Sequence, residues 1–494
     1  MSVIALTQLI NSLSKSEKRT FKLETKKLRG EKQYQYLFDL IDRDTHITRD
    51  ALIKNFEKTY PNAAFDVAVQ YLFRRITDTL INSKSRKEQH YNVYYGLQQI
   101  NLLKERNLAE EAYKLLLQLK KKAATMENLP LQYIIQREEL DYLSTISFKG
   151  VPEKNLIELQ VSAREILREI RNTQEHYSLY ESLIFRIMQL ESLSPAEVNK
   201  MDDLILSELS IVNARVKQNL ETQKIHLLFQ SLFLNHTGDY KSSLKTFYDL
   251  NRLFERNPGK WKHPPLDYYS VLDGILQNLR SINQYDKMDF YIDKLKQLDR
   301  SAYPEHFTFL VKKTVLLYEL AFYNATGQAA SAVTHIARQH KEVWQLHSLS
   351  DPDKQTELCF YTALSFFNQK ELKKAARSIQ TVVLTKRDHH LSAPRRACML
   401  LNIMIHYENR DFEFLDYEIR SYKRLFNAQH KMHLLEQFIF KTVKVNPVLH
   451  NMLKRRQLWD RRFAPLQDAI KNDKNENLLL CYFDFTQWAW SKFK

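Results

Sequence analysis

A short turn between two apolar helical segments is the feature that most constrains how this chain can fold. The turn reads Gly238-Asp239-Tyr240, and apolar residues at helical spacing precede and follow it within residues 221–258. Glycine and aspartate are both typical turn residues. The pattern therefore predicts a helix, a tight turn and an antiparallel second helix.

The same pattern recurs four more times in the later part of the 494-residue chain, with turns expected around Asn283, Gly327, Lys370 and Arg410. One position early in each second helix should pack closely against the first helix, and its copies are 45, 44, 43 and 40 residues apart. The residues at that position are Ser243, Met288, Ala332, Ala375 and Leu415. Because one hairpin cannot bury its apolar face alone, repeated hairpins stack on one another. The sequence therefore predicts an all-α repeat array.

This hairpin resembles the tetratricopeptide repeat. Ser231 is the small residue late in the first helix, Ser243 the small residue early in the second, and Phe247 the aromatic residue four positions on. The resemblance implies a right-handed α-α superhelix whose concave face binds a partner protein or peptide. The repeats here are longer than the roughly 34 residues of that family and overlap the roughly 40–47 residues of HEAT and armadillo repeats. Another α-solenoid family is therefore the alternative.

Three parts are expected along the chain. Residues 1–88 should form a helical N-terminal cap domain, 89–445 the repeat array and 446–494 the C-terminal capping helices. In the first part, Ser14 and Glu17 have the spacing of a capping box, in which each side chain bonds the backbone amide of the other residue. A helix is therefore expected to begin at about residue 15.

Some helices outside the clearest hairpins can also be placed. Residues 154–171 and 174–192 are expected as separate helices, and 448–473 as one long helix, with a kink possible at Pro465. The final stretch, 478–490, is apolar on nearly all sides, which predicts a buried terminal helix. An oligomer contact or a partner site is the alternative for its many aromatic residues.

The composition favours long helices and gives no sign of catalysis. The chain has only 7 glycines and 12 prolines, fewer than strand-rich folds with many turns generally need. No phosphate-binding loop, zinc-binding spacing or nucleophile elbow occurs. The histidines in Lys386-Arg387-Asp388-His389-His390 could be metal ligands, but adjacent loop histidines are more often exposed. We therefore predict no enzyme activity, no cofactor and no metal.

Cysteine usage and hydropathy indicate a cytoplasmic protein. Cys359, Cys398 and Cys481 are far apart and odd in number, which does not suggest a disulfide framework. The first residues do not resemble a secretion signal. No segment reaches the roughly 18 consecutive apolar residues of a membrane span.

The resemblance also predicts where a partner would bind. In tetratricopeptide repeats the first helix of each hairpin lines the concave face, and its groove positions correspond here to eight residues. They are Asp273, Gln277, Arg280, Leu317, Asn324, Phe360, Phe367 and Tyr407. Such a mixed polar and aromatic lining suits an extended peptide or a helix. For Leu317, Phe360 and Phe367 the alternative is that they belong to the core between repeats.

Positive charge suggests a second class of partner. Formal net charge is +16, from 74 basic and 58 acidic residues. Basic residues concentrate in two patches, around 386–396 and 454–462, the second of which contains Lys454, Arg455, Arg456, Arg461 and Arg462. These cations could bind phosphates, and Trp459 could stack on bases. A nucleic-acid-associated protein is therefore the alternative to a protein-interaction scaffold.

Overall fold

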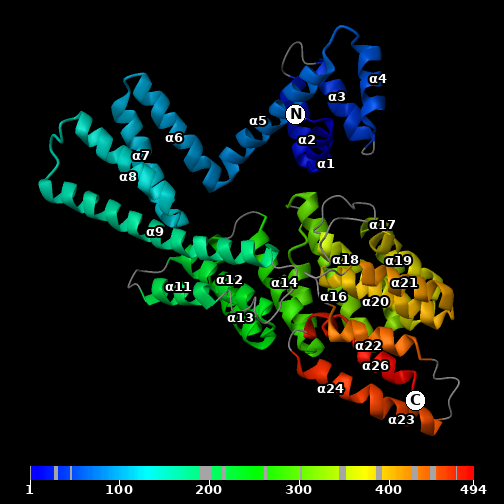
Figure 1. Ribbon diagram of the computed structural model, residues 1–494. Coiled ribbons are helices and arrows are strands. Elements are labelled where there is room, and N and C mark those ends of the chain that lie inside the picture. The colour runs from blue at the N-terminus through cyan, green and yellow to red at the C-terminus, as the bar shows by residue number, and fades with distance from the viewer. Residues whose placement is uncertain are drawn as a thin grey trace. The chain divides into compact units, whose positions relative to one another are not determined.

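The computed structural model of this protein describes residues 2–26, 32–44, 47–189, 202–213, 219–260, 264–300, 303–343, 352–384, 392–425, 432–445, 452–473 and 476–494. Within these ranges every regular element is a helix, and neighbouring helices pack against one another (Figure 1). The all-α fold predicted from the sequence is confirmed. None of the helices so described is long and apolar enough to cross a membrane.

The chain divides into two compact units. We call them the N-terminal unit, residues 1–174, 216–220 and 301–306, and the C-terminal unit, residues 175–215, 221–300 and 307–494. The division falls inside one long helix. The domain boundaries predicted at residues 88 and 445 do not coincide with this division, and they stay predictions.

The N-terminal unit is built from short and medium helices. They are α1 (Val3–Asn11), α2 (Lys15–Lys26), α3 (Lys32–Arg43), α4 (Arg49–Thr59), α5 (Phe65–Lys87), α6 (Gln89–Glu105), α7 (Ala109–Met126), α8 (Leu129–Thr145) and the first part of α9 (Glu153–Gln189). Helices α1 to α5 share one core, which includes Leu6, Phe38 and Leu72. The predicted capping box is confirmed at the start of α2. There the Glu17 carboxylate accepts from the Ser14 amide at 2.8 Å, and the Ser14 hydroxyl accepts from the Glu17 amide at 3.3 Å.

Helix α9 corrects one prediction. Residues 154–171 and 174–192 do not form separate helices, because α9 continues without a break from Glu153 to Gln189. No glycine or proline lies between Pro152 and Pro195. Every residue in between can therefore keep a helical backbone hydrogen bond at little cost in conformational free energy.

The C-terminal unit contains the hairpins that the sequence pattern predicted. Besides the end of α9, its helices are α11 (Asp202–Asn213), α12 (Leu220–His236), α13 (Tyr240–Arg256), η2 (Pro258–Lys260), α14 (Leu266–Ser281), η3 (Tyr285–Lys287), α15 (Met288–Lys296), α16 (Glu305–Ala325), α17 (Ala329–Val343), α18 (Pro352–Asn368), α19 (Leu372–Leu384), α20 (Ala393–Glu408), α21 (Phe412–Arg424), α22 (Leu434–Val443), α23 (Met452–Arg462), α24 (Ala464–Asn472), α25 (Asn477–Leu480) and α26 (Phe485–Ser491). The single helix expected over 448–473 is two helices, α23 and α24, with Pro465 in the first turn of α24. Residues 448–451 lie outside the described residues.

One turn geometry recurs at the five predicted hairpin turns. The turn residue adopts a left-handed backbone conformation each time, with φ of 77° at Gly238, 58° at Asn283, 75° at Gly327, 61° at Lys370 and 58° at Arg410. The amide of the following residue then donates to the carbonyl five residues before it, as in a Schellman motif. The regular spacing in the sequence is thus the spacing of one repeated helix end.

The helices of the first predicted hairpin approach closely at small residues. The Ser243 hydroxyl donates to the Ser231 backbone carbonyl at 3.0 Å, and both residues are fully buried. The next helix, α14, packs its Gly274 under the ring of Phe247, where an added Cβ would lie 2.4 Å from the ring carbons. The residues equivalent to Ser243 in the later hairpins, Met288, Ala332, Ala375 and Leu415, are buried as well.

Replacing Gly274 by alanine should lower the free energy of unfolding of the C-terminal unit by up to about 2 kcal/mol. Overpacking against Phe247 costs about 1–3 kcal/mol, which outweighs the gain of about 1 kcal/mol in helix propensity. All 5 tryptophans of the chain belong to the C-terminal unit, so tryptophan fluorescence during urea denaturation follows this unit.

A double variant provides the control for this prediction. Gly274→Ala combined with Phe247→Leu should lose less stability than the sum of the two single changes, because the smaller side chain leaves room for the added methyl group. Strict additivity would show that the ring does not restrict this position.

Candidate functional site

Helices α14, α16, α18 and α20 lie next to one another and form one face of the C-terminal unit, which we call the receiving face. The Tyr318 hydroxyl on α16 donates to the Asp273 carboxylate on α14 at 2.7 Å. The Asn324 amide on α16 donates to the Ser365 hydroxyl on α18 at 2.7 Å. Helix α20 packs directly on α18. All four are the first helices of predicted hairpins, from the second hairpin to the fifth.

A buried cluster of charges joins the helices of this face. The Arg280 guanidinium lies 3.2 Å from the Glu357 carboxylate, and the Lys354 ammonium lies 2.6 Å from that of Asp273. The side chain of Arg280 is 1% exposed and that of Glu357 8% exposed. The Arg280 guanidinium carbon also lies 5.9 Å from the centre of the Tyr318 ring. Two cations and two carboxylates from α14 and α18 thus balance one another, with the Arg280–Glu357 pair buried and the Lys354–Asp273 pair half-buried.

Electrostatics keep the cluster ionised despite its burial. Burial by itself would raise the pKa of Glu357, but the charges of Arg280 and Lys354 lower that pKa overall below its ordinary value. Burial by itself would lower the pKa of Lys354, but Asp273 and Glu357 raise that pKa overall. Each charge therefore depends on its neighbours, as expected for ions in a low-dielectric interior.

The end of the chain occupies the receiving face. We call residues 476–494 the C-terminal segment. Its Tyr482 hydroxyl donates to the Glu357 carboxylate at 2.8 Å. The Tyr482 ring lies 4.8 Å from the Arg280 guanidinium carbon and 5.8 Å from the Phe360 ring. The Tyr361 hydroxyl donates to the Tyr482 backbone carbonyl at 3.4 Å. Tyr482 is therefore bound through its hydroxyl, its ring and its backbone.

A second contact holds the C-terminal segment six residues further on, at Trp488. The Trp488 indole N–H donates to the Glu408 carboxylate at the end of α20 at 2.9 Å. The Tyr407 ring packs edge-on against the indole at 5.7 Å between centres. Lys492 forms an ion pair with the same Glu408 carboxylate. This contact is less buried than the first, since the Glu408 side chain is 29% exposed.

Glu476 fixes the beginning of the C-terminal segment. Its carboxylate accepts from the amides of Leu434 and Leu435, at 2.7 and 2.9 Å, and so caps the N-terminus of α22. Burial by itself would raise the pKa of Glu476, but His433 and the two amides lower that pKa overall. The carboxylate therefore contributes more to stability in its charged form.

A polar cavity of about 400 Å³ lies between the receiving face and the C-terminal segment. Its lining includes Ser281, Asn283, Tyr285, Asn324 and Tyr361 on one side and Cys481, Tyr482, Asp484 and Thr486 on the other. The C-terminal segment, although residues such as Leu479 and Phe485 are fully buried, therefore does not fill the whole space beside it.

Four of the predicted groove residues are buried, which corrects the prediction that they face a partner. Arg280, Leu317 and Phe360 are at most 1% exposed, and Phe367 is 8% exposed. For Leu317, Phe360 and Phe367 the alternative assignment to the core holds. Arg280 is buried because Glu357 and three tyrosine rings surround it.

The other four predicted groove residues are half-buried on or beside the receiving face. Asp273 and Tyr407 bind Lys354 and Trp488 respectively, as described above. Asn324 lines the cavity, and its amide oxygen accepts from the exposed Asn368 at 3.0 Å. The structure shows no specific contact of the Gln277 side chain that bears on the site.

The basic patches are only partly on the surface. On α23, Lys454, Arg456, Arg461 and Arg462 are exposed and Arg455 is half-buried. Trp459 is 4% exposed, packed against Phe463, Trp490 and Phe493, so the prediction that it can stack on bases is wrong. In the other patch, residues 386–391 lie outside the described residues. There the buried Arg396 forms an ion pair with Glu436 at 3.1 Å.

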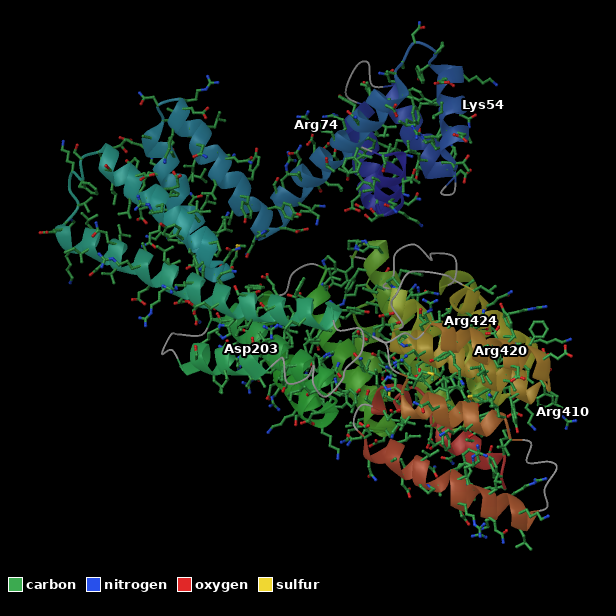
Figure 2. The ribbon with its side chains drawn as sticks, in the orientation of Figure 1. Lys54, Arg74, Asp203, Arg410, Arg420 and Arg424 are labelled. Carbon is green, nitrogen blue, oxygen red and sulfur yellow. The ribbon has the colours of Figure 1, made fainter. Side chains whose placement is uncertain are left out.

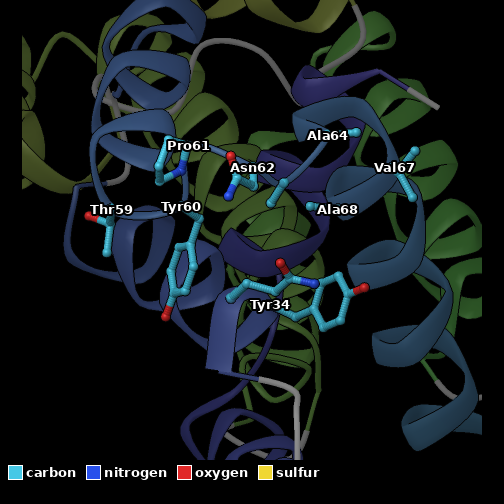
Figure 3. Close-up of a pocket in the computed structure, with 10 residues that line it drawn as sticks. Tyr34, Thr59, Tyr60, Pro61, Asn62, Ala64, Val67 and Ala68 are labelled. Atoms are coloured by element: carbon cyan, nitrogen blue, oxygen red, sulfur yellow. The ribbon is translucent and has the colours of Figure 1, made fainter.

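A second cavity, of about 420 Å³, lies in the N-terminal unit where α3, α4 and α5 meet (Figure 3). Tyr34, Thr59, Tyr60, Asn62 and Ala64 are among the residues that line it. The lining contains no carboxylate, cationic group, imidazole or thiol. Its hydroxyls and amides could bind a small neutral molecule, but they offer no acid, base or nucleophile of suitable reactivity.

Candidate reactive groups are those that could bind a metal ion, and the thiols that could react as nucleophiles. Among the described residues no group of three or more His, Cys, Asp or Glu side chains is placed to hold a metal ion. The three cysteines are free thiols. Burial raises the pKa of Cys481 to about 11 and also raises the pKa of Cys359 and Cys398, so these thiols stay protonated at neutral pH.

The sequence reasoning missed four residues that form the contacts of this site. They are Glu357, Glu408, Tyr482 and Trp488. The aromatic richness of 478–490 was a usable signal, because buried tyrosine and tryptophan side chains need polar partners. The partners themselves lie 125 and 80 residues away in sequence, and no local pattern connects them.

No family model, curated protein or solved structure matches this chain.

Removing the Tyr482 hydroxyl should destabilise the C-terminal unit. Tyr482→Phe deletes a buried hydrogen bond to a charged group, worth about 1.5–3 kcal/mol, and the loss should appear in urea denaturation followed by tryptophan fluorescence. Tyr417→Phe on α21 is the matched control, since Tyr417 is 59% exposed, and should change stability by less than about 0.5 kcal/mol. Equal effects of the two changes would contradict the hydrogen bond to Glu357.

The stability of the C-terminal unit should decrease as the pH is lowered, in part because the Glu476 carboxylate becomes protonated. Because its pKa is lower in the folded state than the ordinary 4.5, the contribution of Glu476 is complete above pH 4.5 and is lost as pH falls through the lowered folded value. Glu476→Gln should therefore lose less stability between pH 7 and pH 3 than the unchanged protein does. Urea denaturation at both pH values measures this, with the exposed Glu413→Gln as control. Parallel losses in all three proteins would contradict the assignment.

Proposed function

We propose that this protein is a non-catalytic interaction scaffold that binds a segment of a partner protein on the receiving face. In this proposal the C-terminal unit is a right-handed superhelix of tetratricopeptide-like hairpins, and the receiving face is its concave side. The repeated turn geometry and the order of α16, α18 and α20 support the hairpin reading. Repeat arrays of this kind typically present extended concave binding surfaces.

The observation that carries the proposal is that the receiving face already holds a polypeptide segment. Tyr482 and Trp488 of the C-terminal segment are bound by Glu357 and Glu408 through hydrogen bonds of 2.8 and 2.9 Å. Aromatic rings of the face pack against both side chains. A surface with spaced acceptors and aromatic rings can recognise a short helix or turn by the same contacts.

The free thiols support a reducing compartment. Three unpaired cysteines are typical of proteins that function inside the cell, where disulfides are rare. We therefore propose a cytoplasmic partner.

Site-specific photo-crosslinking in the native host tests this function. A photoreactive amino acid at Asn368, which is exposed beside Asn324, should give a discrete adduct with a partner protein. The same amino acid at Arg420, which is exposed on α21 outside the receiving face, is the matched control (Figure 2). Adducts at Arg420 and none at Asn368 would place binding on another surface and contradict the proposal.

Nucleic-acid binding is the second candidate, favoured by the exposed Lys454, Arg456, Arg461 and Arg462 on α23. If these four cations bind phosphates, affinity for a DNA duplex should fall about 10²-fold between 50 and 200 mM salt. Changing Arg461 and Arg462 to glutamine should then make the salt dependence less steep. Under the scaffold proposal we expect no duplex binding even at 50 mM salt. Filter binding or fluorescence anisotropy distinguishes the two.

A further inference from the structure

We propose that the C-terminal segment is a built-in competitor that occupies the place of the partner on the receiving face. The partner segment would then carry the same chemistry: a tyrosine hydroxyl for Glu357 and a tryptophan indole N–H, six residues further on, for Glu408. This inference rests on the proposed function and specifies its ligand.

The C-terminal segment contacts the receiving face through two side chains of the same kind of chemistry. Tyr482 and Trp488 each place one donor on one carboxylate and one ring against an aromatic side chain. Lys492 adds an ion pair with Glu408. A second polypeptide with the same donors and rings can form each of these contacts without a change in the helices of the face.

The buried charges of the receiving face stay paired when Tyr482 moves away. Glu357 keeps Arg280 at 3.2 Å and Lys354 at 4.0 Å, and Lys354 keeps Asp273 at 2.6 Å. No buried charge is left unpaired, which would be the most costly consequence of opening such a site. Glu408 is 29% exposed already, so water can solvate it when Trp488 and Lys492 move away.

The space between the two parts is also incompletely filled. The cavity of about 400 Å³ is lined by Ser281, Asn324 and Tyr361 of the receiving face and by Cys481 and Asp484 of the C-terminal segment. The cavity is partly open to solvent, so water already reaches one side of the joint between the two parts.

Two aromatic residues of the C-terminal segment attach it elsewhere. Trp490 and Phe493 pack against Trp459 of α23, at 4.8 and 5.3 Å between ring centres. Trp488 and Trp490 are two positions apart and so lie on opposite sides of α26. The contacts to α20 can therefore break while those to α23 persist, which keeps the competitor close to its site.

A tethered competitor weakens the apparent affinity of any free ligand. If the C-terminal segment occupies the face about 99% of the time, the apparent affinity is reduced about 100-fold. The effective concentration of a tethered segment reaches the millimolar range. Loosening the segment should therefore increase binding of a free ligand strongly.

The test uses the full-length protein and, as probe, a fluorescent peptide with the sequence of residues 476–494. Fluorescence anisotropy should show at least 10-fold tighter binding to the double variant Tyr482→Ala, Trp488→Ala than to the unchanged protein. Gln487→Ala, at an exposed position in the same helix, is the control and should bind as the unchanged protein does. A peptide with alanine at the same two positions should bind to none of these proteins.

Equal binding of the peptide to all proteins, or binding to none, would overturn this inference. If the double variant loses its helical circular dichroism, Tyr482→Phe decides in the same assay. A rise in affinity of at least threefold supports the inference, and no rise overturns it. A partner crosslinked at Asn368 together with a negative peptide result would leave the proposed function standing and reject only the competitor. A positive peptide result together with adducts only at Arg420 would show that the C-terminal segment is exchangeable, but it would reject the partner site and with it the role of competitor.

Discussion

The charge cluster of Arg280, Glu357, Lys354 and Asp273 is the interaction on which the architecture of the C-terminal unit depends. It joins α14 to α18, which are 77 residues apart at the Arg280–Glu357 contact. Taking four charges out of water costs several kcal/mol per ion, and the mutual attraction repays this only when the geometry is good. A cluster of this kind adds little net stability, but it penalises every arrangement in which a charge lacks its partner. It therefore fixes how α14 and α18 align.

The aromatic residues around the cluster extend this constraint to the end of the chain. The Arg280 guanidinium lies within 6 Å of the ring centres of Tyr318, Tyr361 and Tyr482, at 5.9, 5.6 and 4.8 Å. Cation–π attraction strengthens when the cation is desolvated. The Tyr482 ring is the nearest of the three. The C-terminal segment is therefore attracted to this point by the same charge that aligns the helices.

What could be predicted from the sequence follows from how local each feature is. The capping box at Ser14 and the turns at Gly238 and Lys370 depend on residues within one helical turn or one helix end, and they were predicted correctly. The break expected before residue 174 was wrong, because no glycine or proline interrupts the helix there. Local rules are reliable where the backbone decides the outcome.

The candidate site was beyond such rules. Arg280 lies on the helix that was predicted to line the groove, but its side chain is buried. That burial depends on Glu357 and on Tyr482, which is 202 positions later in the chain. The groove positions implied by the family resemblance indicated where a segment would lie. They did not indicate that the chain supplies one itself. That fact requires the positions of residues far apart in sequence.

The distribution of charge also helps to decide whether the C-terminal segment can exchange with a partner or is a permanent part of the core. A core element usually leaves an unpaired group or a void when it is removed, so the surrounding structure fails with it. Here the four charges of the cluster remain paired without Tyr482, and Glu408 can be solvated without Trp488. Vacating the face still exposes apolar side chains of the segment that are fully buried, namely Leu479, Phe485 and Ala489. A second polypeptide that supplies the same donors and a similar apolar surface recovers that cost, which is the physical condition for exchange at a single site.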